Sequence, residues 1–133
     1  MIEAIADTHT TIWYLLADSR LSPNARAAIE AAAAANAHIG VSSISLVEIV
    51  YLQEKGRIPP AMLNAVIAEL RRPDAVLVEV PVEFGVVQAM ERVPRSEVPE
   101  LADRVIGATA LHLGVHVLTR GTDLTTSSVP TLW

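Results

Sequence analysis

The chain has 133 residues, a length that fits one domain rather than two. Apolar residues make up 51% of it and charged residues 19%, which excludes a disordered chain, and no apolar run approaches the ~18 residues of a membrane span. The absence of cysteine excludes disulfides, thiolate catalysis and cysteine-based zinc sites. A formal net charge of -5 argues against binding nucleic acid through a broad basic surface, but leaves room for a local basic rim. The chain does not start with a secretion-signal pattern, so we expect a cytoplasmic protein with no membrane partner.

Four short apolar segments predict the strands of a sheet. Their apolar character is nearly continuous, which is typical of strands buried on both faces. The intervening segments are long enough for helical crossovers, so the sheet should be mostly parallel. The predicted strands are residues 2–6, 38–42, 76–80 and 115–119.

Helix signals fill the gaps between these strands. Ser22-Pro23 predicts a capped helix ahead of an alanine-rich run, and Pro59-Pro60 opens another helix that Pro73 ends. Gly114 closes the last long helix, where a left-handed residue is favoured. The predicted helices beyond the alanine-rich one are residues 44–54, 61–72, 82–92 and 101–113. The alternation predicts one α/β domain over residues 1–133, a three-layer α/β/α sandwich with a mostly parallel central sheet of four to five strands.

Three carboxylates are candidates for a site at the carboxyl end of this sheet, where ligands of such folds bind. Asp7 directly follows the first strand, although capping the next helix would explain it equally well. Glu48 lies in a largely apolar helical run, where an ionised carboxylate needs a partner unless the position is solvated. Asp103 opens a third apolar helix, where attraction to the helix amino end is the simpler explanation.

Three carboxylates at one end of a sheet would repel one another unless a divalent cation lay among them. Mg²⁺ or Mn²⁺ fits, because these hard ions bind carboxylate and water oxygens and complete their shell with substrate phosphates. Such a metal can activate water for attack on phosphorus. Our hypothesis is therefore phosphodiester hydrolysis.

Four stretches together resemble the PIN domain, and more narrowly the VapC-type toxins of bacterial toxin–antitoxin pairs. They occur in the family's order over nearly the whole chain: ADTHTTIW, SSISLVEIV, ELADRVIGATALHLGVHVLTR and VPTLW. The resemblance implies a parallel-sheet α/β/α fold and a Mg²⁺- or Mn²⁺-dependent endoribonuclease acting on tRNA, rRNA or mRNA. It also implies a homodimer and a cognate antitoxin that blocks the site.

Residue by residue, the resemblance places the family's first three acids on Asp7, Glu48 and Asp103, as catalytic residues and metal ligands. Thr8 and Thr119 match the small polar positions that support the site, and simple capping of helix and strand ends explains each of them equally well.

The fourth acid is where this sequence departs from the family. An Asp commonly follows the Thr-Arg after the last strand, and this chain has Gly121 there. Asp123, two residues further on, or Glu100, about one helical turn before Asp103, could supply the charge.

Basic and aromatic residues give weaker signals of RNA binding. The chain has nine arginines and one lysine, which favours planar, bidentate phosphate contacts. Trp13 and Tyr14 could stack on a base or belong to the core or a subunit interface, and Trp133 should pack against the sheet edge. The candidate RNA-binding residues are Arg92, Arg104 and Arg120, with Arg95 also near the site, and a solvated surface position is the alternative for each.

Other readings explain the sequence less well. A haloacid-dehalogenase-type phosphatase needs a second Asp two residues after the first, where this chain has His9, and a receiver domain needs a Lys on a later strand, whereas Lys55 is in or after a helix. The four histidines show no metal-ligand spacing. Two alternatives stay open: a PIN-like module, impaired by Gly121, that binds RNA or antitoxin without cutting, and a purely structural α/β partner protein.

Overall fold

One parallel sheet of five strands runs through the computed structural model, which describes residues 1–133. Its strand order is β3-β2-β1-β4-β5, and all four strand pairs are parallel, as the sequence predicted. The fifth strand comes from the terminal VPTLW stretch. The strands are β1 (Ile2–Ala6), β2 (His38–Ser42), β3 (Leu77–Val80), β4 (His116–Leu118) and β5 (Thr131–Leu132).

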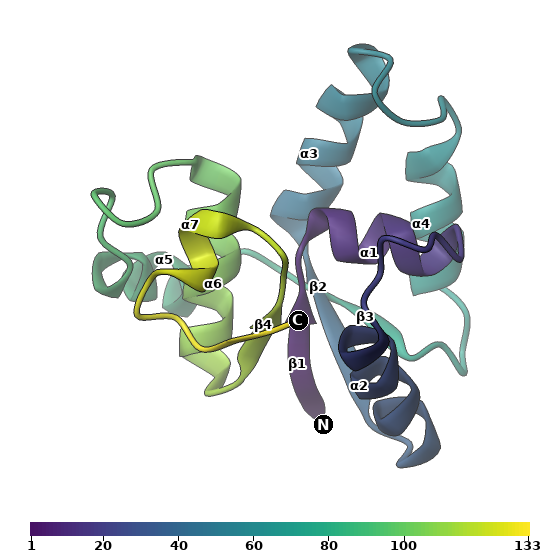
Figure 1. Cartoon of the computed structure of the whole chain (residues 1–133), viewed down its shortest axis with the longest axis horizontal. Coiled ribbons are helices and arrows are strands. Elements are labelled where there is room, and N and C mark those ends of the chain that lie inside the picture. Colours follow the sequence, from purple (N-terminus) through teal and green to yellow (C-terminus); the bar gives the residue numbers. More distant parts are fainter.

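Seven α-helices and one 3₁₀ helix connect the strands (Figure 1). Two segments differ from the prediction. The helix expected over residues 82–92 is a short α-helix followed by the 3₁₀ helix, and the one-turn helix after Gly121 is not among the predicted helices. The helices are α1 (Thr8–Leu15), α2 (Pro23–Ala34), α3 (Ser43–Glu54), α4 (Met62–Leu70), α5 (Phe84–Ala89), the 3₁₀ helix η1 (Met90–Arg92), α6 (Leu101–Leu113) and α7 (Thr122–Thr125).

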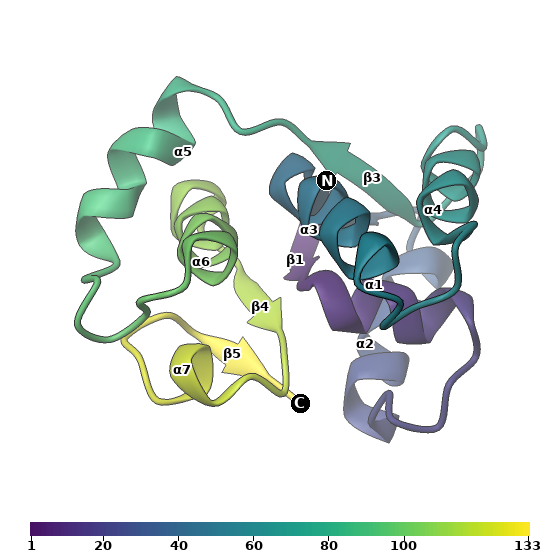
Figure 2. The same cartoon turned by 90° about the horizontal axis from the view of Figure 1, so that it is seen from above.

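Helices cover both faces of the sheet, which gives three layers. Neighbouring residues of β1 point to opposite faces: Ile5 belongs to a core with α5 and α6, whereas Ala4 and Ala6 belong to a core with Ile29 of α2. A third apolar cluster joins α1, α2, α3 and α4 beside the sheet. Figure 2 shows this division, with α5, α6 and α7 on one side and α1 to α4 on the other.

Local signals in the sequence set several helix ends. Ser22 caps α2, its Oγ accepting a hydrogen bond from the Ala25 amide at 3.0 Å, and Gly114 ends α6 with a left-handed φ of 70°.

No helix of the chain combines the length and the apolar character needed to cross a membrane.

The strand order creates a natural binding position. From β1 the chain proceeds to β2 and β3 on one side and later returns to β4 on the other side of β1. The connections that leave β1 and β4 therefore diverge, and such a switch point opens a crevice at the carboxyl ends of the strands. Asp7 follows β1 and Thr119 follows β4, so both lie at this crevice.

Candidate functional site

Asp7 caps a helix and faces a cleft at the same time. Its Oδ1 accepts a hydrogen bond from the Thr10 amide at 2.9 Å, which makes it the N-cap of α1. Its Oδ2 accepts a hydrogen bond from Thr119 Oγ1 at 2.5 Å. The residue is only 8% exposed, so a carboxylate is held in a defined orientation at the end of β1. The capping explanation and the functional one are compatible, because each carboxylate oxygen accepts one hydrogen bond here and can accept a further contact.

The two supporting threonines have different tasks. Thr119 donates to Asp7 and accepts a hydrogen bond from the Gly121 amide at 2.9 Å, so its hydroxyl is used as donor and acceptor together. Thr8 Oγ1 donates instead to Ser45 Oγ at 2.9 Å and ties α1 to α3. Only Thr119 hydrogen-bonds to a candidate acid. Thr8 also lines the cleft, but its hydroxyl forms a buried contact between two helices.

A cleft of about 450 Å³, which we name the acidic cleft, brings the predicted acids together. It contains Asp7, Glu48 and Asp103, and Glu100 joins them. Asp123 does not line it, although it lies in the first turn of α7 nearby. Of the two alternatives for the fourth acid, Glu100 is the one at the cleft wall. The lining residues are Asp7, Thr8, His9, Trp13, Arg20, Glu48, Glu100, Asp103, Arg120, Gly121 and Thr122.

The acids of the cleft influence one another. Partial burial, followed by the negative charge of Glu48 and Asp7 and then of Glu100 and Asp123, raises the pKa of Asp103 to about 6. Near neutral pH the ionised form of Asp103 is therefore unfavourable, because it is partly buried and is repelled by the neighbouring carboxylates. A cation among these residues would relieve that repulsion.

The donor set fits a hard divalent cation. Nowhere in the structure do three or more His, Asp or Glu side chains gather in a way that could hold a metal ion. Mg²⁺, however, commonly binds proteins through one or two carboxylates and takes its remaining ligands from water and substrate phosphates. Because the cleft offers carboxylates that already repel one another, it meets this smaller requirement.

The candidate arginines separate into two groups. Arg120 lines the acidic cleft. Arg104 does not, because its guanidinium donates from Nε to the Val93 carbonyl at 2.7 Å and from Nη2 to the Met90 carbonyl at 3.0 Å. Arg92 and Arg95 are exposed and also lie outside the lining. The position of Arg104 favours a structural role over the RNA contact expected from its neighbourhood in sequence.

Sequence reasoning did not find Arg20, which also lines the cleft. It lies in the connection between α1 and α2, where no local pattern marks it. The guanidinium carbons of Arg20 and Arg120 lie over the ring of Trp13, at 5.1 and 4.6 Å from its centroid. Trp13 itself is 5% exposed and packs against Trp133, so it is a core residue whose ring forms part of the cleft wall.

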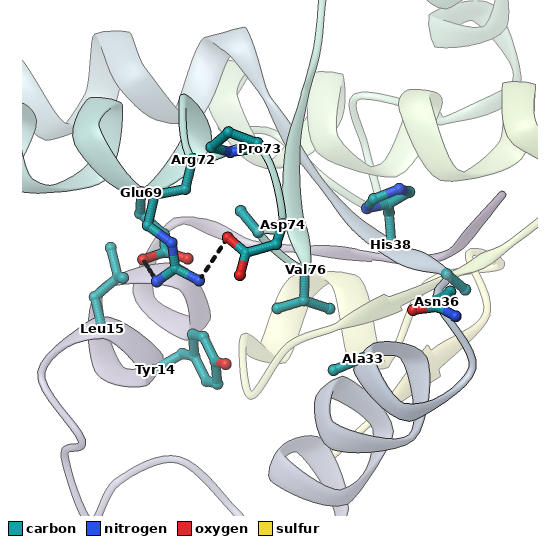
Figure 3. A pocket seen from close by; sticks show the side chains of 12 residues that line it. Tyr14, Leu15, Ala33, Asn36, His38, Glu69, Arg72, Pro73, Asp74 and Val76 are labelled. Atoms are coloured by element: carbon teal, nitrogen blue, oxygen red, sulfur yellow. Dashed lines mark hydrogen bonds and ion pairs between the residues drawn. The ribbon is translucent and has the colours of Figure 1, made fainter.

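A larger hollow of about 620 Å³ lies elsewhere, and its position argues against a catalytic role. It includes the starts of β2 and β3, the opposite end of the sheet from the acidic cleft. Its one arginine, Arg72, is paired with Glu69 at 3.0 Å and Asp74 at 3.5 Å (Figure 3). It therefore offers no free cation for a phosphate and no cluster of acids for a metal.

A third hollow of about 390 Å³ borders the acidic cleft and shares Glu48 and Glu100 with it. We name it the apolar groove. Helix α3 supplies half of its lining residues, including the exposed Val47 and Tyr51, and α6 contributes the exposed Leu101. The lining residues are Ile44, Val47, Glu48, Tyr51, Leu52, Lys55, Arg57, Glu100, Leu101 and Ala102.

The chain is a parallel α/β protein with an acidic cleft at the switch point of its sheet. A match of its sequence to a family model identifies the family. The family model described as PIN domain matches residues 4–127. The chain belongs to the PIN domain family, whose members are generally nucleases. No curated protein matches its sequence.

Solved structures with the same fold include three of bacterial proteins. VapBC2 from Rickettsia felis bound to a DNA fragment from their promoter aligns with a TM-score of 0.70 and 16% identity, covering 100% of this chain and 98% of the other. A toxin–antitoxin complex from Klebsiella pneumoniae gives 0.64 and 18%, with 98% and 97% covered. FitAcB from Neisseria gonorrhoeae gives 0.60 and 21%, with 100% and 97% covered. At these identities the likeness shows a shared fold.

Proposed function

We propose that this chain is a Mg²⁺- or Mn²⁺-dependent endoribonuclease and the toxin of a toxin–antitoxin pair. The observation that carries the proposal is the acidic cleft, where burial and surrounding carboxylates raise the pKa of Asp103. Perturbed pKa values of this kind cluster at functional sites, and a positively charged ligand in the cleft would offset the repulsion among its carboxylates. The position at the carboxyl ends of β1 and β4 and the membership of the PIN family support the same conclusion.

In this proposal Asp7, Glu48 and Asp103 form the metal site, with one or two of their carboxylates binding the ion directly and water or substrate phosphate completing its shell. Glu100 adds negative charge at the wall of the cleft, and Asp123 contributes from further away. A metal bound at these residues would activate water and would stabilise the negative charge that develops on the phosphoryl oxygens. Thr119 fixes the orientation of Asp7 through its hydrogen bond, and the α1 amide on Oδ1 prevents the carboxylate from turning.

The partner proposal rests on the apolar groove. Three similar folds occur in structures described as VapBC2, a toxin–antitoxin complex and FitAcB. In this chain, a segment of a cognate antitoxin lying in the apolar groove would reach the acids that the groove shares with the cleft. Tyr51 and Leu101, which are 62% and 65% exposed, offer apolar surface to it. Such a segment should carry apolar residues and a cation directed at Glu48 and Glu100. A homodimer in the cytoplasm completes this proposal.

A PIN-like module that binds without cutting is the second candidate, and Gly121 is the observation that favours it. The family acid is missing there, and Asp123 does not line the cleft. Such a module would bind RNA or antitoxin with the same surface but would show no turnover with metal.

The deciding experiment is cleavage of a pool of structured RNAs by the purified, antitoxin-free chain with Mn²⁺, and again with EDTA. We expect cleavage that requires Mn²⁺ and that Asp103→Asn lowers by at least about a hundredfold, the range typical of losing a transition-state electrostatic contact. Glu91→Gln is the matched control, because Glu91 is exposed and lies outside the cleft. Cleavage that survives EDTA and Asp103→Asn would contradict the proposal.

The remaining outcomes separate the candidates. No cleavage with Mn²⁺, combined with RNA binding, would favour the non-cutting module. Neither cleavage nor any effect of Mn²⁺ on stability or RNA binding would favour a purely structural partner. For the antitoxin, Tyr51→Ala should weaken inhibition of cleavage without lowering cleavage itself.

A further inference from the structure

Two arginines share one aromatic ring at the wall of the acidic cleft, and their electrostatic environments differ. Arg20 and Arg120 both line the cleft, and both guanidinium carbons lie over Trp13. A guanidinium on an aromatic face gains cation–π attraction, and its edge N–H groups stay available for hydrogen bonds. The question is which of the two has donors left for a ligand.

Arg20 is already neutralised. It donates from Nε to Asp18 Oδ1 at 3.1 Å and from Nη2 to Asp18 Oδ2 at 2.8 Å, a bidentate pair. The Arg20 amide also donates to Asp18 Oδ1, at 2.8 Å. The side-chain and backbone hydrogen bonds of Arg20 lower the pKa of Asp18 to about 2. The charge of Arg20 is thus matched by an ionised carboxylate, and the Nε–Nη2 edge of its guanidinium is occupied.

Arg120 has no such partner. It takes part in none of the ion pairs and none of the side-chain hydrogen bonds of the chain, although acids surround it in the cleft. Asp18 feels its charge, but the ion pair of Asp18 is with Arg20. Of the two cations that line the cleft, Arg120 is the one that remains free.

Both ends of the Arg120–Trp13 contact are held in place. Arg120 directly follows Thr119, which is 0% exposed and whose hydroxyl binds Asp7 and the Gly121 amide. The indole of Trp13 is buried and has Trp133 against it at 5.8 Å between ring centroids. Stacking on a fixed ring keeps the flexible Arg120 side chain from collapsing onto the carboxylates.

We propose that Arg120 binds a phosphate of the nucleic-acid strand that enters the acidic cleft, and that Trp13 is the residue that positions Arg120 for this contact. The inference rests on the proposed function for the identity of the strand. A phosphodiester accepts two parallel N–H bonds from a guanidinium, which is the geometry that an unpaired, stacked arginine presents. The phosphate held is one beside the metal-binding acids, and the arginine offsets the repulsion that these acids exert on the strand.

The test is the affinity of a short fluorescent single-stranded RNA of mixed sequence, measured by anisotropy in EDTA so that no cleavage occurs. Arg120→Gln should weaken binding about tenfold and reduce the slope of log K against log salt by about one phosphate contact. Arg120→Lys should recover part of this loss, because it restores the charge without the fork.

The control is Asp18→Asn combined with Arg20→Gln. This pair of substitutions removes the neutralised cation over the same ring without changing the net charge, and without releasing Asp18 to pair with Arg120. We expect binding within about twofold of the unmodified chain, a change within ordinary surface effects. A loss as large as that of Arg120→Gln would overturn the assignment, as would unchanged binding in Arg120→Gln.

Trp13 is tested through coupling, so that its role in the core is separated from its role in positioning. Trp13→Phe keeps a weaker aromatic face and should reduce affinity about threefold when Arg120 is present, and not at all in the Arg120→Gln background. Equal losses in both backgrounds would show that Trp13 acts through the core alone. Trp13→Leu should give a larger coupled loss, with thermal unfolding as the check that the variant folds.

The outcome can be distinguished from that of the proposed function. RNA binding that depends on Arg120, without any cleavage in Mn²⁺, would leave this inference standing and remove the nuclease. If the chain cleaves RNA, Arg120→Gln should raise KM about tenfold and change kcat by less than about threefold, since the contact is to ground state and transition state alike. Cleavage with an unchanged KM would remove the inference and leave the nuclease.

Discussion

Thr119 Oγ1 donates a 2.5 Å hydrogen bond to Asp7 Oδ2, joining two residues that are 112 positions apart in the sequence. The same hydroxyl accepts the amide of Gly121. One buried side chain therefore connects the first acid of the cleft to the position where the family's fourth acid is missing. Changes at either position should be transmitted through Thr119.

Thr119→Val should destabilise the chain by about 1.5–3 kcal/mol, because it keeps the shape but leaves a buried carboxylate oxygen and an amide without their partner. Urea unfolding in EDTA measures this loss. Thr119→Ser retains the hydroxyl and should lose less than half as much. If the valine variant unfolds at the same urea concentration as the unmodified chain, the hydrogen bond does not stabilise Asp7.

Asp103→Asn should change stability in a way that depends on pH. The pKa of Asp103 is raised from 3.8 to about 6, so the folded chain keeps a proton that the unfolded chain releases. Below about pH 4 the protonated Asp103 is neutral and the fold has its full stability. As the pH rises through about 6, Asp103 ionises in the folded chain and this stability is lost. At pH 7 the ionised Asp103 then opposes folding, and Asn removes that opposition.

In EDTA at about pH 7, Asp103→Asn should therefore raise the stability by about 1 kcal/mol, a figure discounted for partial exposure, and Tm by roughly 3–5 °C. At about pH 4 the two chains should unfold together. Thermal unfolding at both pH values is the measurement, with Glu91→Gln as the control. The same difference in Tm at both pH values would show that repulsion among the acids is not its cause.

Much of the fold could be predicted because its signals are local. Apolar segments mark the four longer strands, Ser22-Pro23 marks the start of α2 and Gly114 the end of α6. Strand β5 has two residues and α7 has four, and elements of that length are set by their tertiary contacts. Val86 and Ala89 are buried, but the segment turns into a 3₁₀ helix at Met90, which its composition does not indicate.

The candidate site divides in the same way. Asp7, Glu48 and Asp103 could be expected together because each follows or lies near the carboxyl end of a parallel strand, and the structure brings them to one cleft. Their catalytic role remains a prediction. Arg20 reaches the cleft from a connecting segment, and Arg104 turns to backbone carbonyls; both arrangements depend on contacts that no spacing in the sequence records.

Arg104→Met should destabilise the chain without weakening RNA binding. The substitution removes two hydrogen bonds from a charged donor to the Val93 and Met90 carbonyls, and leaves these carbonyls to find water, at a cost of about 2–3 kcal/mol. Arg104→Lys should recover little, since one ammonium cannot reproduce the planar fork. Urea unfolding and RNA anisotropy measure the two effects. A loss of RNA affinity as large as that of Arg120→Gln would show that Arg104 contacts RNA after all.

Gly121→Asp tests whether the missing acid limits metal binding. The backbone conformation accepts a side chain, because φ is -64°. The new Cβ would lie 3.2 Å from Thr119 Oγ1, a tight contact that an alanine at this position shares. Gly121 is the N-cap of α7 and has no side-chain cap, so the carboxylate has two uses: it can cap α7 or turn to the cleft. Gly121→Ala is the matched control, since it adds the same Cβ without the charge.

We expect Gly121→Asp to bind Mn²⁺ about fivefold to tenfold more tightly than Gly121→Ala, as one added carboxylate near the ion should provide. Calorimetric titration with Mn²⁺ measures the affinity, and thermal unfolding in EDTA shows whether the new carboxylate caps α7 instead. If the two variants bind Mn²⁺ equally and Gly121→Asp has the higher Tm, the new carboxylate caps α7 and does not reach the metal. The natural glycine would then not be what limits metal binding. Tighter Mn²⁺ binding accompanied by faster RNA cleavage would show that this chain works with an incomplete set of acids, whose deficit Glu100 offsets only in part.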